Sequence, residues 1–198
     1  LDTPGHAIFS QMRARGADIT DIVVLVVAAD DGIMPQTKEA IDHAKAAKKT
    51  IIVAVNKCDV QGADPTRVRT QLMEHGLTPV DFGGDIECVD VSAKTGDGME
   101  ALLELLALQA EVLELNANPS ANARASVIEA RVQAGKGPTA TVIVQSGTLK
   151  AGMPFICGPF NGKIKSMFDD RGNAIKTAGP ATPVEVLGFA ELANVGDE

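Results

Sequence analysis

Hydrophobic and polar positions follow two different patterns along this chain of 198 residues. In residues 1–115, two runs of consecutive apolar residues, Ile22–Ala29 and Ile51–Val55, predict strands, and the alternating stretch Glu87–Val91 predicts a third. Uninterrupted, β-branched runs are typical of strands that are covered on both faces, as in parallel sheets. The first part of the chain therefore predicts a parallel sheet.

Helices are expected between and after these strands. The segment Pro35–Lys49 begins with proline, which suits a first helical turn, and ends with lysines that complement the negative end of a helix. Asp64 is a suitable cap for a helix that starts at Pro65 and ends near Gly76. Leucines at helical spacing predict a further helix over Met99–Leu115. Strands that alternate with helices indicate an α/β domain with right-handed crossovers.

A different pattern follows a short polar stretch. Residues 116–123 (NANPSANA) are small, polar and contain proline, so we expect a linker there. In residues 124–198, turns rich in glycine and proline separate short apolar segments, and no long helix is indicated. The expected strands are Val127–Val132, Thr139–Val144, Pro154–Cys157, Gly162–Met167 and Val184–Leu187. This pattern predicts a small closed β-barrel.

Charge and composition narrow the possible functions. The net charge is −8, but residues 1–115 carry 10 Lys and Arg against 19 Asp and Glu, whereas residues 116–198 carry 8 against 7. The first part should repel a nucleic-acid backbone, and the second should not. Aromatic residues make up only 3%, which disfavours nucleic-acid binding by base stacking. Three scattered cysteines and the lack of a long apolar run favour a cytoplasmic protein that does not enter a membrane.

Polar loops follow the ends of the predicted strands. Asn56–Asp59 (NKCD) comes after the second strand, Ser92–Lys94 (SAK) after the third and Asp30–Gly32 after the first. The opening stretch Leu1–His6 (LDTPGH) would be a fourth such loop if a strand preceded it. Because ligands of open α/β sheets bind beyond the carboxyl ends of the strands, we expect these loops to converge on one edge.

The NKCD loop has the chemistry of a guanine-reading site. The carboxylate of Asp59 can accept from both the ring N–H and the exocyclic amino group of guanine, a donor pair that adenine lacks. The amide of Asn56 can address the carbonyl oxygen and N7 of guanine. Backbone N–H groups near Ala93 can bond the same carbonyl. Buried bidentate contacts of this kind reject a wrong ligand by about 10⁴–10⁵.

Each motif alone is also compatible with an ordinary turn. Asn and Asp in NKCD can satisfy nearby backbone groups, SAK has little specificity, and DTPG has the proline and glycine of a type I turn. The order DxxG, NKxD, SAK, with the last two directly after strands, favours a nucleotide site over three unrelated turns.

This ordered set resembles the signature of the translational GTPases, and longer stretches resemble bacterial translation initiation factor two. Similar stretches are DTPGHAIFSQMRARGADITDIVVLVVAADDGIMPQT, AVNKCD, VSAKTGDG and GKGPTATVIVQSGTLKAGMPFICG. The resemblance covers essentially the whole chain and implies an α/β fold, a partial parallel-sheet GTPase domain. That domain's C-terminal part would be residues 1–115, followed by the linker 116–123 and a β-barrel domain II, residues 124–198. A related elongation-type GTPase remains an alternative, since elongation factors share Asp-x-Pro-Gly-His and NKxD.

The resemblance also implies roles for the motif residues. Asp2 would hold magnesium through water, the N–H of Gly5 would bond the γ-phosphate, and His6 would be the catalytic residue that orients the attacking water. Residues after Gly5, including Met12, Arg13 and Arg15, would belong to a mobile switch. In the base site, Asn56 and Asp59 would read guanine. Lys57 and Lys94 would flank the base. The full implied set of GTP or GDP contacts is Asp2, Thr3, Pro4, Gly5, His6, Asn56, Lys57, Cys58, Asp59, Ser92, Ala93 and Lys94.

The chain contains no G-x-x-x-x-G-K-[ST] phosphate loop. The resemblance places that loop before Leu1 and the domain for initiator tRNA after Glu198. Without that loop, about four hydrogen bonds to charged groups are lost, each contributing about 1.5–3 kcal/mol. A nucleotide with a micromolar dissociation constant would then bind about four orders of magnitude more weakly. We therefore expect the chain alone to bind GTP and GDP negligibly and not to hydrolyse GTP.

The resemblance implies partners as well. The small ribosomal subunit and the ribosome are expected, with initiator tRNA bound through domains absent here; a non-catalytic module that docks on the ribosome is the alternative function. By the same resemblance, the apolar strand Ile22–Ala29 would have an uncovered edge. We expect this edge to pair with another copy of the chain, to be covered by a displaced segment or to form a crystal contact.

Overall fold

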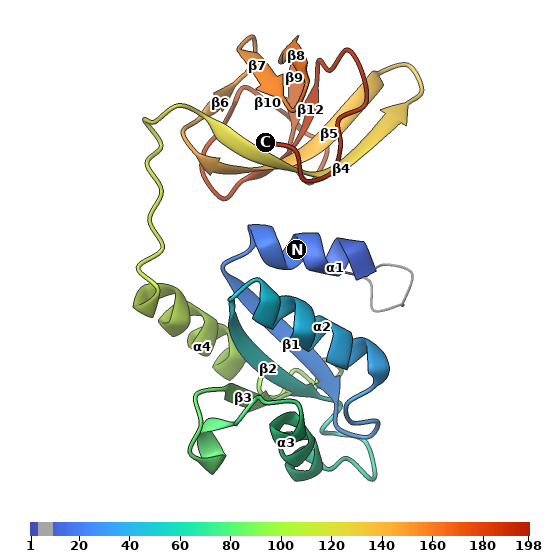
Figure 1. Ribbon diagram of the computed structural model, residues 1–198, viewed down its shortest axis with the longest axis vertical. Helices are drawn as coiled ribbons and strands as arrows, with labels where there is room; N and C mark the ends of the chain where they lie inside the picture. Colours follow the sequence, from blue (N-terminus) through green and yellow to red (C-terminus); the bar gives the residue numbers. More distant parts are fainter. Residues whose placement is uncertain (4–9) are drawn as a thin grey trace. The chain divides into compact units, whose positions relative to one another are not determined.

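The computed structural model describes residues 1–3 and 10–198 (Figure 1). The chain forms two compact units, Leu1–Leu115 and Asn116–Glu198. The first contains α1 (Ser10–Ile19), β1 (Ile22–Ala28), α2 (Pro35–Ala46), β2 (Thr50–Asn56), α3 (Pro65–Glu74), η2 (Val80–Phe82), β3 (Glu87–Asp90) and α4 (Met99–Val112). The second contains β4 (Arg124–Gln133), β5 (Gly137–Ser146), β6 (Leu149–Lys150), β7 (Pro154–Cys157), β8 (Phe160–Lys163), β9 (Ser166–Phe168), β10 (Ala174–Ile175), β11 (Thr177–Ala178) and β12 (Pro183–Leu187).

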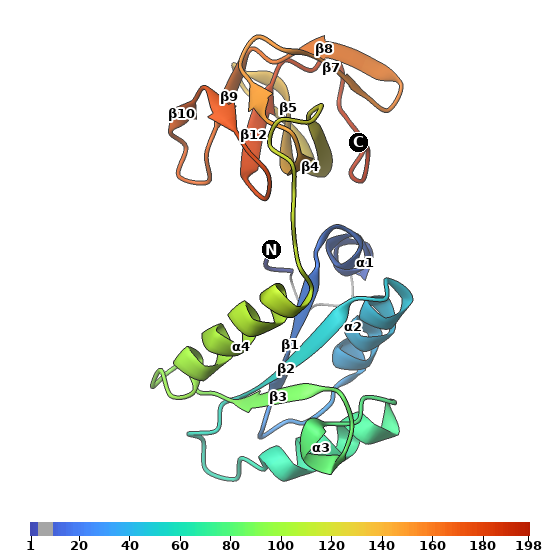
Figure 2. The same cartoon turned by 90° about the vertical axis from the view of Figure 1, so that its left-hand side faces the viewer.

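The first unit is built on a parallel sheet in the order β1-β2-β3. The middle strand, β2, explains the uninterrupted apolar run, because it is covered on both faces. Val53 packs with Ile41 of α2 and Leu72 of α3, whereas the neighbouring Ile52 packs with Leu102 of α4. Figure 2 shows α4 on one side of the sheet and α2 and α3 on the other. The predicted α/β class with a parallel sheet is confirmed.

The helices begin where the sequence predicts but end earlier. The α2 helix stops at Ala46 rather than Lys49, since Lys48 adopts a left-handed φ of +53°. Likewise α4 stops at Val112, and Glu114 adopts a φ of +47°.

The helix α1 was not predicted, because its sequence SQMRARGADI contains a glycine and has no apolar stripe. It occupies the stretch that the family resemblance assigns to a mobile switch. Arg13 of α1 is buried and forms an ion pair with Glu39 of α2 at 2.8 Å. That contact fastens α1 to α2.

One edge of the sheet is open in the described part of the chain. Strand β1 pairs only with β2 there, and its side chains Val24 and Val26 are 36% and 59% exposed. A groove of about 480 Å³ runs along this strand between α1 and α2. The edge is therefore both unpaired along its backbone and apolar on its surface.

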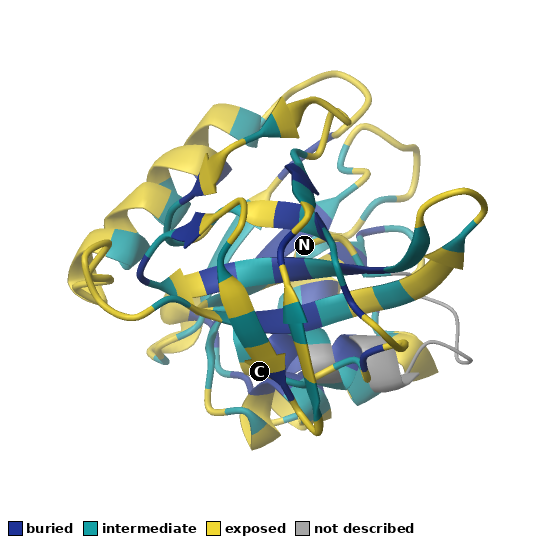
Figure 3. Ribbon diagram, turned by 90° about the horizontal axis from the view of Figure 1, so that it is seen from above, coloured by how far each residue is buried: buried dark blue, intermediate teal, exposed yellow. Residues whose placement is uncertain are grey.

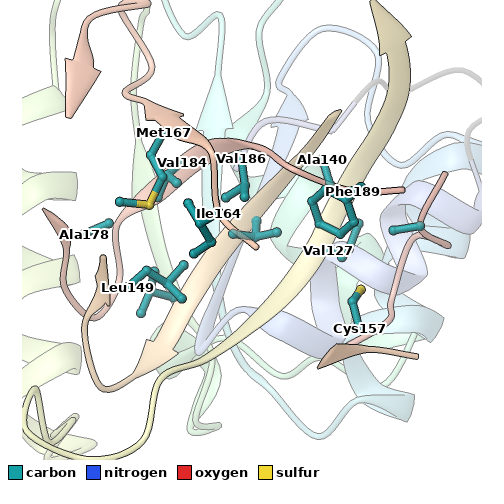
Figure 4. Close-up of a cluster of buried hydrophobic side chains, with 13 residues drawn as sticks. Val127, Ala140, Leu149, Cys157, Ile164, Met167, Ala178, Val184, Val186 and Phe189 are labelled. Atoms are coloured by element: carbon teal, nitrogen blue, oxygen red, sulfur yellow. The ribbon is translucent and has the colours of Figure 1, made fainter. Parts of the chain in front are cut away.

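The second unit is a β-barrel-like structure. A five-stranded antiparallel sheet has the order β10-β9-β12-β5-β4, and two further pairs, β6–β11 and β7–β8, complete it. Its core contains the buried side chains of Val127, Met167, Val184 and Phe189 (Figure 4).

In both units, buried residues lie along the strands, and exposed ones gather in loops and on the outer sides of helices (Figure 3). Among the described residues, no helix has the length and apolar character needed to cross a membrane.

The stretch Gly162–Met167, predicted as one strand, is divided between β8 and β9. The backbone changes partners at this point: Ile164 donates to the carbonyl of Met153 at 2.9 Å, and Lys165 donates to that of Leu187 at 2.8 Å. The side chain of Ile164 is buried in the core at the break. An apolar pattern alone does not reveal such a change of partner.

Candidate functional site

The NKCD and SAK loops meet at the carboxyl edge of the parallel sheet. Their strands are neighbours, with Val55 opposite Asp90 in the register of β2 and β3. The loops are also tied directly, since the N–H of Cys58 donates to the carbonyl of Val91 at 3.3 Å. The predicted convergence of these two motifs is therefore observed.

The side chain of Asn56 links the two loops. Its Oδ1 accepts from the N–H of Lys57 at 2.8 Å and from the N–H of Ala93 at 3.1 Å. The amide oxygen is thus used by the protein itself. The Nδ2 group has no hydrogen-bond acceptor among the residues that the structure describes, so it remains available as a donor to a ligand.

Asp59 is held by Ser92. The hydroxyl of Ser92, which is 1% exposed, donates to Oδ1 of Asp59 at 2.6 Å and accepts from the N–H of Thr95 at 3.2 Å. This hydrogen bond lowers the pKa of Asp59 below its ordinary value, so the carboxylate is ionised at neutral pH. Asp59 itself is exposed, and its second oxygen has no side-chain hydrogen-bond partner in residues 1–3 and 10–198.

The expected role of Ala93 needs an adjustment. Its backbone N–H is already directed at Asn56, as described above. The next N–H, that of Lys94, has no acceptor within the described ranges and is the one left for a ligand carbonyl. The side chain of Lys94 is exposed. Cys58 faces inward, with its thiol donating to the carbonyl of Val55 at 3.2 Å, so it shapes the loop.

Lys57 has two acidic neighbours that the sequence does not pair with it. Its Nζ lies 3.3 Å from a carboxylate oxygen of Asp30 and 3.3 Å from one of Asp31. These carboxylates raise the pKa of Lys57, with the hydrogen bond to Asp30 as the main cause. The sequence marks the Asp30–Gly32 loop only by its place after a strand. Arg67 and Gln71 of α3 bind this loop and the adjacent Ile33, and no pattern in the sequence marks either these contacts or the pairing with Lys57.

The SAK loop is followed by a short turn, Thr95–Gly98, that joins it to α4. Gly98, the residue before that helix, has a φ of +72°, and a Cβ placed there would lie 2.0 Å from the carbonyl oxygen of Asp90. Because only glycine has no Cβ, the loop returns against the end of β3 through direct backbone packing.

The opening stretch lies elsewhere in the described structure. Asp2 and Thr3 line the groove beside α1 and the strand β1, and Thr3 packs near Gly16 of α1. They form no hydrogen bond with the NKCD or SAK loop in the described part of the chain. The remaining predicted residues of this motif, Pro4, Gly5 and His6, lie outside the described residues.

The polar groups at the edge form one pattern of donors and acceptors. Donors are the Nδ2 of Asn56 and the N–H of Lys94, and the acceptor is the ionised carboxylate of Asp59. A guanine base presents the complementary set: carbonyl O6 and N7 as acceptors, and two adjacent N–H donors. Adenine would place an amino group where O6 stands, opposite the donor, and would leave the carboxylate without its donor pair.

Comparisons with known proteins agree with this chemistry. The family profile described as Elongation factor Tu GTP binding domain matches residues 1–111, and that of Elongation factor G domain 2 matches residues 122–198. Over 198 residues the chain is 58% identical to translation initiation factor IF-2 of Desulforapulum autotrophicum and 58% identical to that of Aquifex aeolicus. The predicted resemblance to bacterial translation initiation factor two is confirmed.

These relatives are much longer than this chain. All of the chain is covered, but it spans only 19% of the Desulforapulum protein and 25% of the Aquifex protein. Among solved structures, GDP-bound aIF5B from Aeropyrum pernix is similar with a TM-score of 0.78 and 25% identity, over 94% of this chain and 40% of that one. Elongation factor SelB from Methanococcus maripaludis in complex with the GTP analogue GppNHp shares the fold, with a TM-score of 0.73 and 24% identity over 98% and 42% of the two chains.

Proposed function

Because the chain belongs to the family of elongation factor Tu GTP-binding domains, we propose that its NKCD and SAK loops bind the guanine base of GTP and GDP. The observation that carries this proposal is the shared hydrogen-bond frame of Asn56, Asp59, Ser92 and Ala93. The frame forms without a ligand and, among the described residues, leaves the donors and the carboxylate that guanine requires without other partners.

Each residue of the frame has a task. Asn56 donates to N7 and the carbonyl edge of guanine, and the N–H of Lys94 donates to O6. Asp59 accepts from the ring N–H and the amino group. The stems of Lys57 and Lys94 cover the faces of the base and sugar, while Ser92, Ala93 and Cys58 keep the loops in shape. Fixed, charge-assisted contacts of this kind favour guanine because another base leaves them unpaired.

The opening motif serves the phosphate end in the intact protein. Asp2 is the residue that would hold Mg²⁺, through water, since this cation keeps several waters and binds few carboxylates. Thr3 and Pro4 belong to the same motif, in which the N–H of Gly5 would bind the γ-phosphate and His6 would orient the attacking water. Magnesium would supply charge neutralisation at the phosphates. GTP hydrolysis is thus proposed for the longer protein, to which this chain contributes the base-reading loops and the opening phosphate motif.

We further propose that the longer protein is a GTP-dependent translation initiation factor. The identity to translation initiation factor IF-2 supports this, as does the aIF5B structure, which is GDP-bound. Its partners would be the small ribosomal subunit and the ribosome in the cytoplasm, with initiator tRNA bound by other domains. The barrel-like unit, whose profile match is to Elongation factor G domain 2, would dock on the ribosome.

The division of the chain follows the same proposal. Residues 1–115 supply the C-terminal part of the GTP-binding domain, residues 116–123 the linker and residues 124–198 domain II. The chain on its own would self-associate through Ile22–Ala29, because the exposed β1 edge offers unpaired backbone groups beside Val24 and Val26.

A nucleotide titration followed by NMR tests the base-binding proposal. Guanosine monophosphate should shift the amide signals of residues 56–59 and 92–94 of this chain at tens of millimolar, while adenosine monophosphate should not. The Asp59→Asn variant should lose the preference for guanine and gain one for xanthosine monophosphate, whose C2 carbonyl accepts from an amide. Asp85→Asn, at an exposed loop aspartate, is the matched control. Equal shifts with both natural nucleotides would contradict the proposal.

A further inference from the structure

We propose that Asp30 and Asp31 are positioning residues that hold the ammonium group of Lys57 at the base-binding loop before a ligand arrives. This inference rests on the proposed function, because it concerns how one of the base-flanking side chains is prepared. It adds a third loop, the one between β1 and α2, to the NKCD and SAK loops of the site.

The carboxylates reach Lys57 from the neighbouring strand end. Asp30 and Asp31 follow β1, and Lys57 follows β2, so adjacent parallel strands deliver them to the same edge. Lys57 Nζ lies 3.3 Å from an oxygen of each carboxylate. Two carboxylates on one ammonium group restrict its position more than a single partner would.

The acidic loop is itself fixed by helix α3. Arg67 Nη2 donates to the carbonyl of Asp31 at 3.0 Å, and the N–H of Ile33 donates to Gln71 Oε1 at 3.0 Å. Gly32 has a φ of +77° in the tight space beside these side chains, and its N–H donates to the carbonyl of Ala28 at 2.8 Å. Two side chains of α3 therefore hold the loop that carries the two carboxylates.

Lys57 is held at its backbone as well. Its φ is +64°, a conformation that few non-glycine residues adopt, and its N–H donates to Oδ1 of Asn56. With the backbone fixed at one end and the ammonium at the other, the aliphatic stem between them loses most of its rotational freedom. Asp30 and Asp31 also favour the protonated ammonium, since they raise its pKa.

Exposure indicates what this arrangement is for. The side chains of Lys57, Asp30 and Asp31 are 46%, 29% and 57% exposed, and ion pairs with such exposure add little to folding stability. The gain lies in binding. A lysine that is already ordered spares the ligand the entropy of ordering a side chain with many rotamers.

The test combines a ligand-free signal with a binding cycle on this chain. Side-chain ¹⁵N NMR of the lysine ammonium groups, assigned through Lys57→Met, reports whether Lys57 is held. In Asp30→Asn/Asp31→Asn, the Lys57 signal should move toward that of a free lysine and its pKa should fall, whereas Asp85→Asn should change neither. Asp30→Glu/Asp31→Glu, which retains the charges, should restore the pKa at least in part.

The binding cycle uses guanosine monophosphate as the probe. Removing both carboxylates should weaken its binding by about threefold to tenfold, the range expected for losing one pre-ordered side chain. This direction is informative, because removing negative charge near an anionic ligand would otherwise strengthen binding. In the Lys57→Met background the same two substitutions should no longer weaken binding.

The outcomes separate the two proposals. An unchanged Lys57 signal in the double variant, unchanged or tighter binding, or a loss that persists with Lys57→Met would overturn the positioning role. A guanine preference that depends on Asp59 would leave the proposed function intact in each of those cases. If the nucleotide shifts no signal in the unmodified chain, the proposed function fails, and the positioning role fails with it.

Discussion

The carboxyl edge of the sheet and the open edge of β1 differ in how completely the chain itself organises them. At the carboxyl edge, side chains and backbone groups of three loops bond to one another, as in the contacts of Asn56 with Ala93 and of Asp59 with Ser92. Along β1, the backbone lacks a partner on one side among the described residues, and Val26 is largely exposed. Contacts within the chain hold the loops of the carboxyl edge in place, whereas the outer side of β1 has no pairing strand among the described residues.

The difference separates the two halves of the proposed nucleotide site. The groups proposed to read the base follow β2, which is buried on both faces, and β3, which is partly buried. Asp2 and Thr3, which belong to the proposed phosphate motif, line the groove beside β1. In the described part of the chain they form no hydrogen bond with the NKCD or SAK loop. The residues proposed for base recognition and those proposed for phosphate recognition therefore lie on different parts of the fold.

The strongest challenge to this comparison is the affinity of the chain for GDP. We expect binding at least about four decades weaker than that of a micromolar site, because the sequence lacks the phosphate loop. Isothermal calorimetry with Mg²⁺ and GDP measures this directly. A micromolar dissociation constant would show that the base loops and the opening motif suffice, and would remove the distinction between the two regions.

The next largest effect concerns the support beneath the carboxyl edge. Leu72→Ala should lower the free energy of unfolding by about 2–5 kcal/mol, since this fully buried side chain packs α3 onto the sheet. Denaturant unfolding followed by circular dichroism gives the value. Leu103→Ala, at a side chain that is 63% exposed on α4, is the control and should change it by less than about 0.5 kcal/mol. Similar losses in both variants would mean that the edge is not supported by this core.

A substitution at the open edge should change association and leave stability nearly constant. Val26→Lys places a charge on the exposed part of β1 and should shift the chain from oligomer to monomer. Its free energy of unfolding should change by only about 0.5 kcal/mol. Analytical ultracentrifugation at several concentrations makes the measurement. An unmodified chain that stays monomeric at every concentration contradicts the proposed self-association.

The smallest effect is the titration of Asp59. The hydrogen bond from Ser92 lowers the pKa of Asp59 below its ordinary value. The bond therefore stabilises the folded chain at pH values above the ordinary pKa. This stabilisation is lost as the pH falls through the lowered pKa. In Ser92→Ala the pKa should move up toward the ordinary value. Carbon-detected NMR of the carboxyl group follows both. An Asp59 pKa that does not respond to the substitution would mean that Ser92 does not hold the carboxylate.

The sequence predicts the regular parts of the fold because burial leaves a clear pattern there. The β1 and β2 runs, the cap at Asp64 and the leucines of α4 all mark their elements. The sequence does not predict α1, because this helix has no apolar stripe. It also does not predict the break between β8 and β9, where the backbone changes its hydrogen-bond partner. In the site, the motifs identify Asn56 and Asp59. The ion pairs of Lys57 depend instead on three-dimensional contacts between loops from different strands.

The backbone contact at Gly98 restricts which sequences can occupy this corner of the molecule. Any side chain there would have to push the carbonyl of Asp90 aside, and that carbonyl belongs to the strand end from which the SAK loop departs. A library randomised at Gly98 and at the exposed Lys94 should therefore give two opposite results under selection for folded protein: one residue type at the first position and many at the second. A single missing methyl group, with no contact to any ligand, thus limits how far the sequence of this corner can vary.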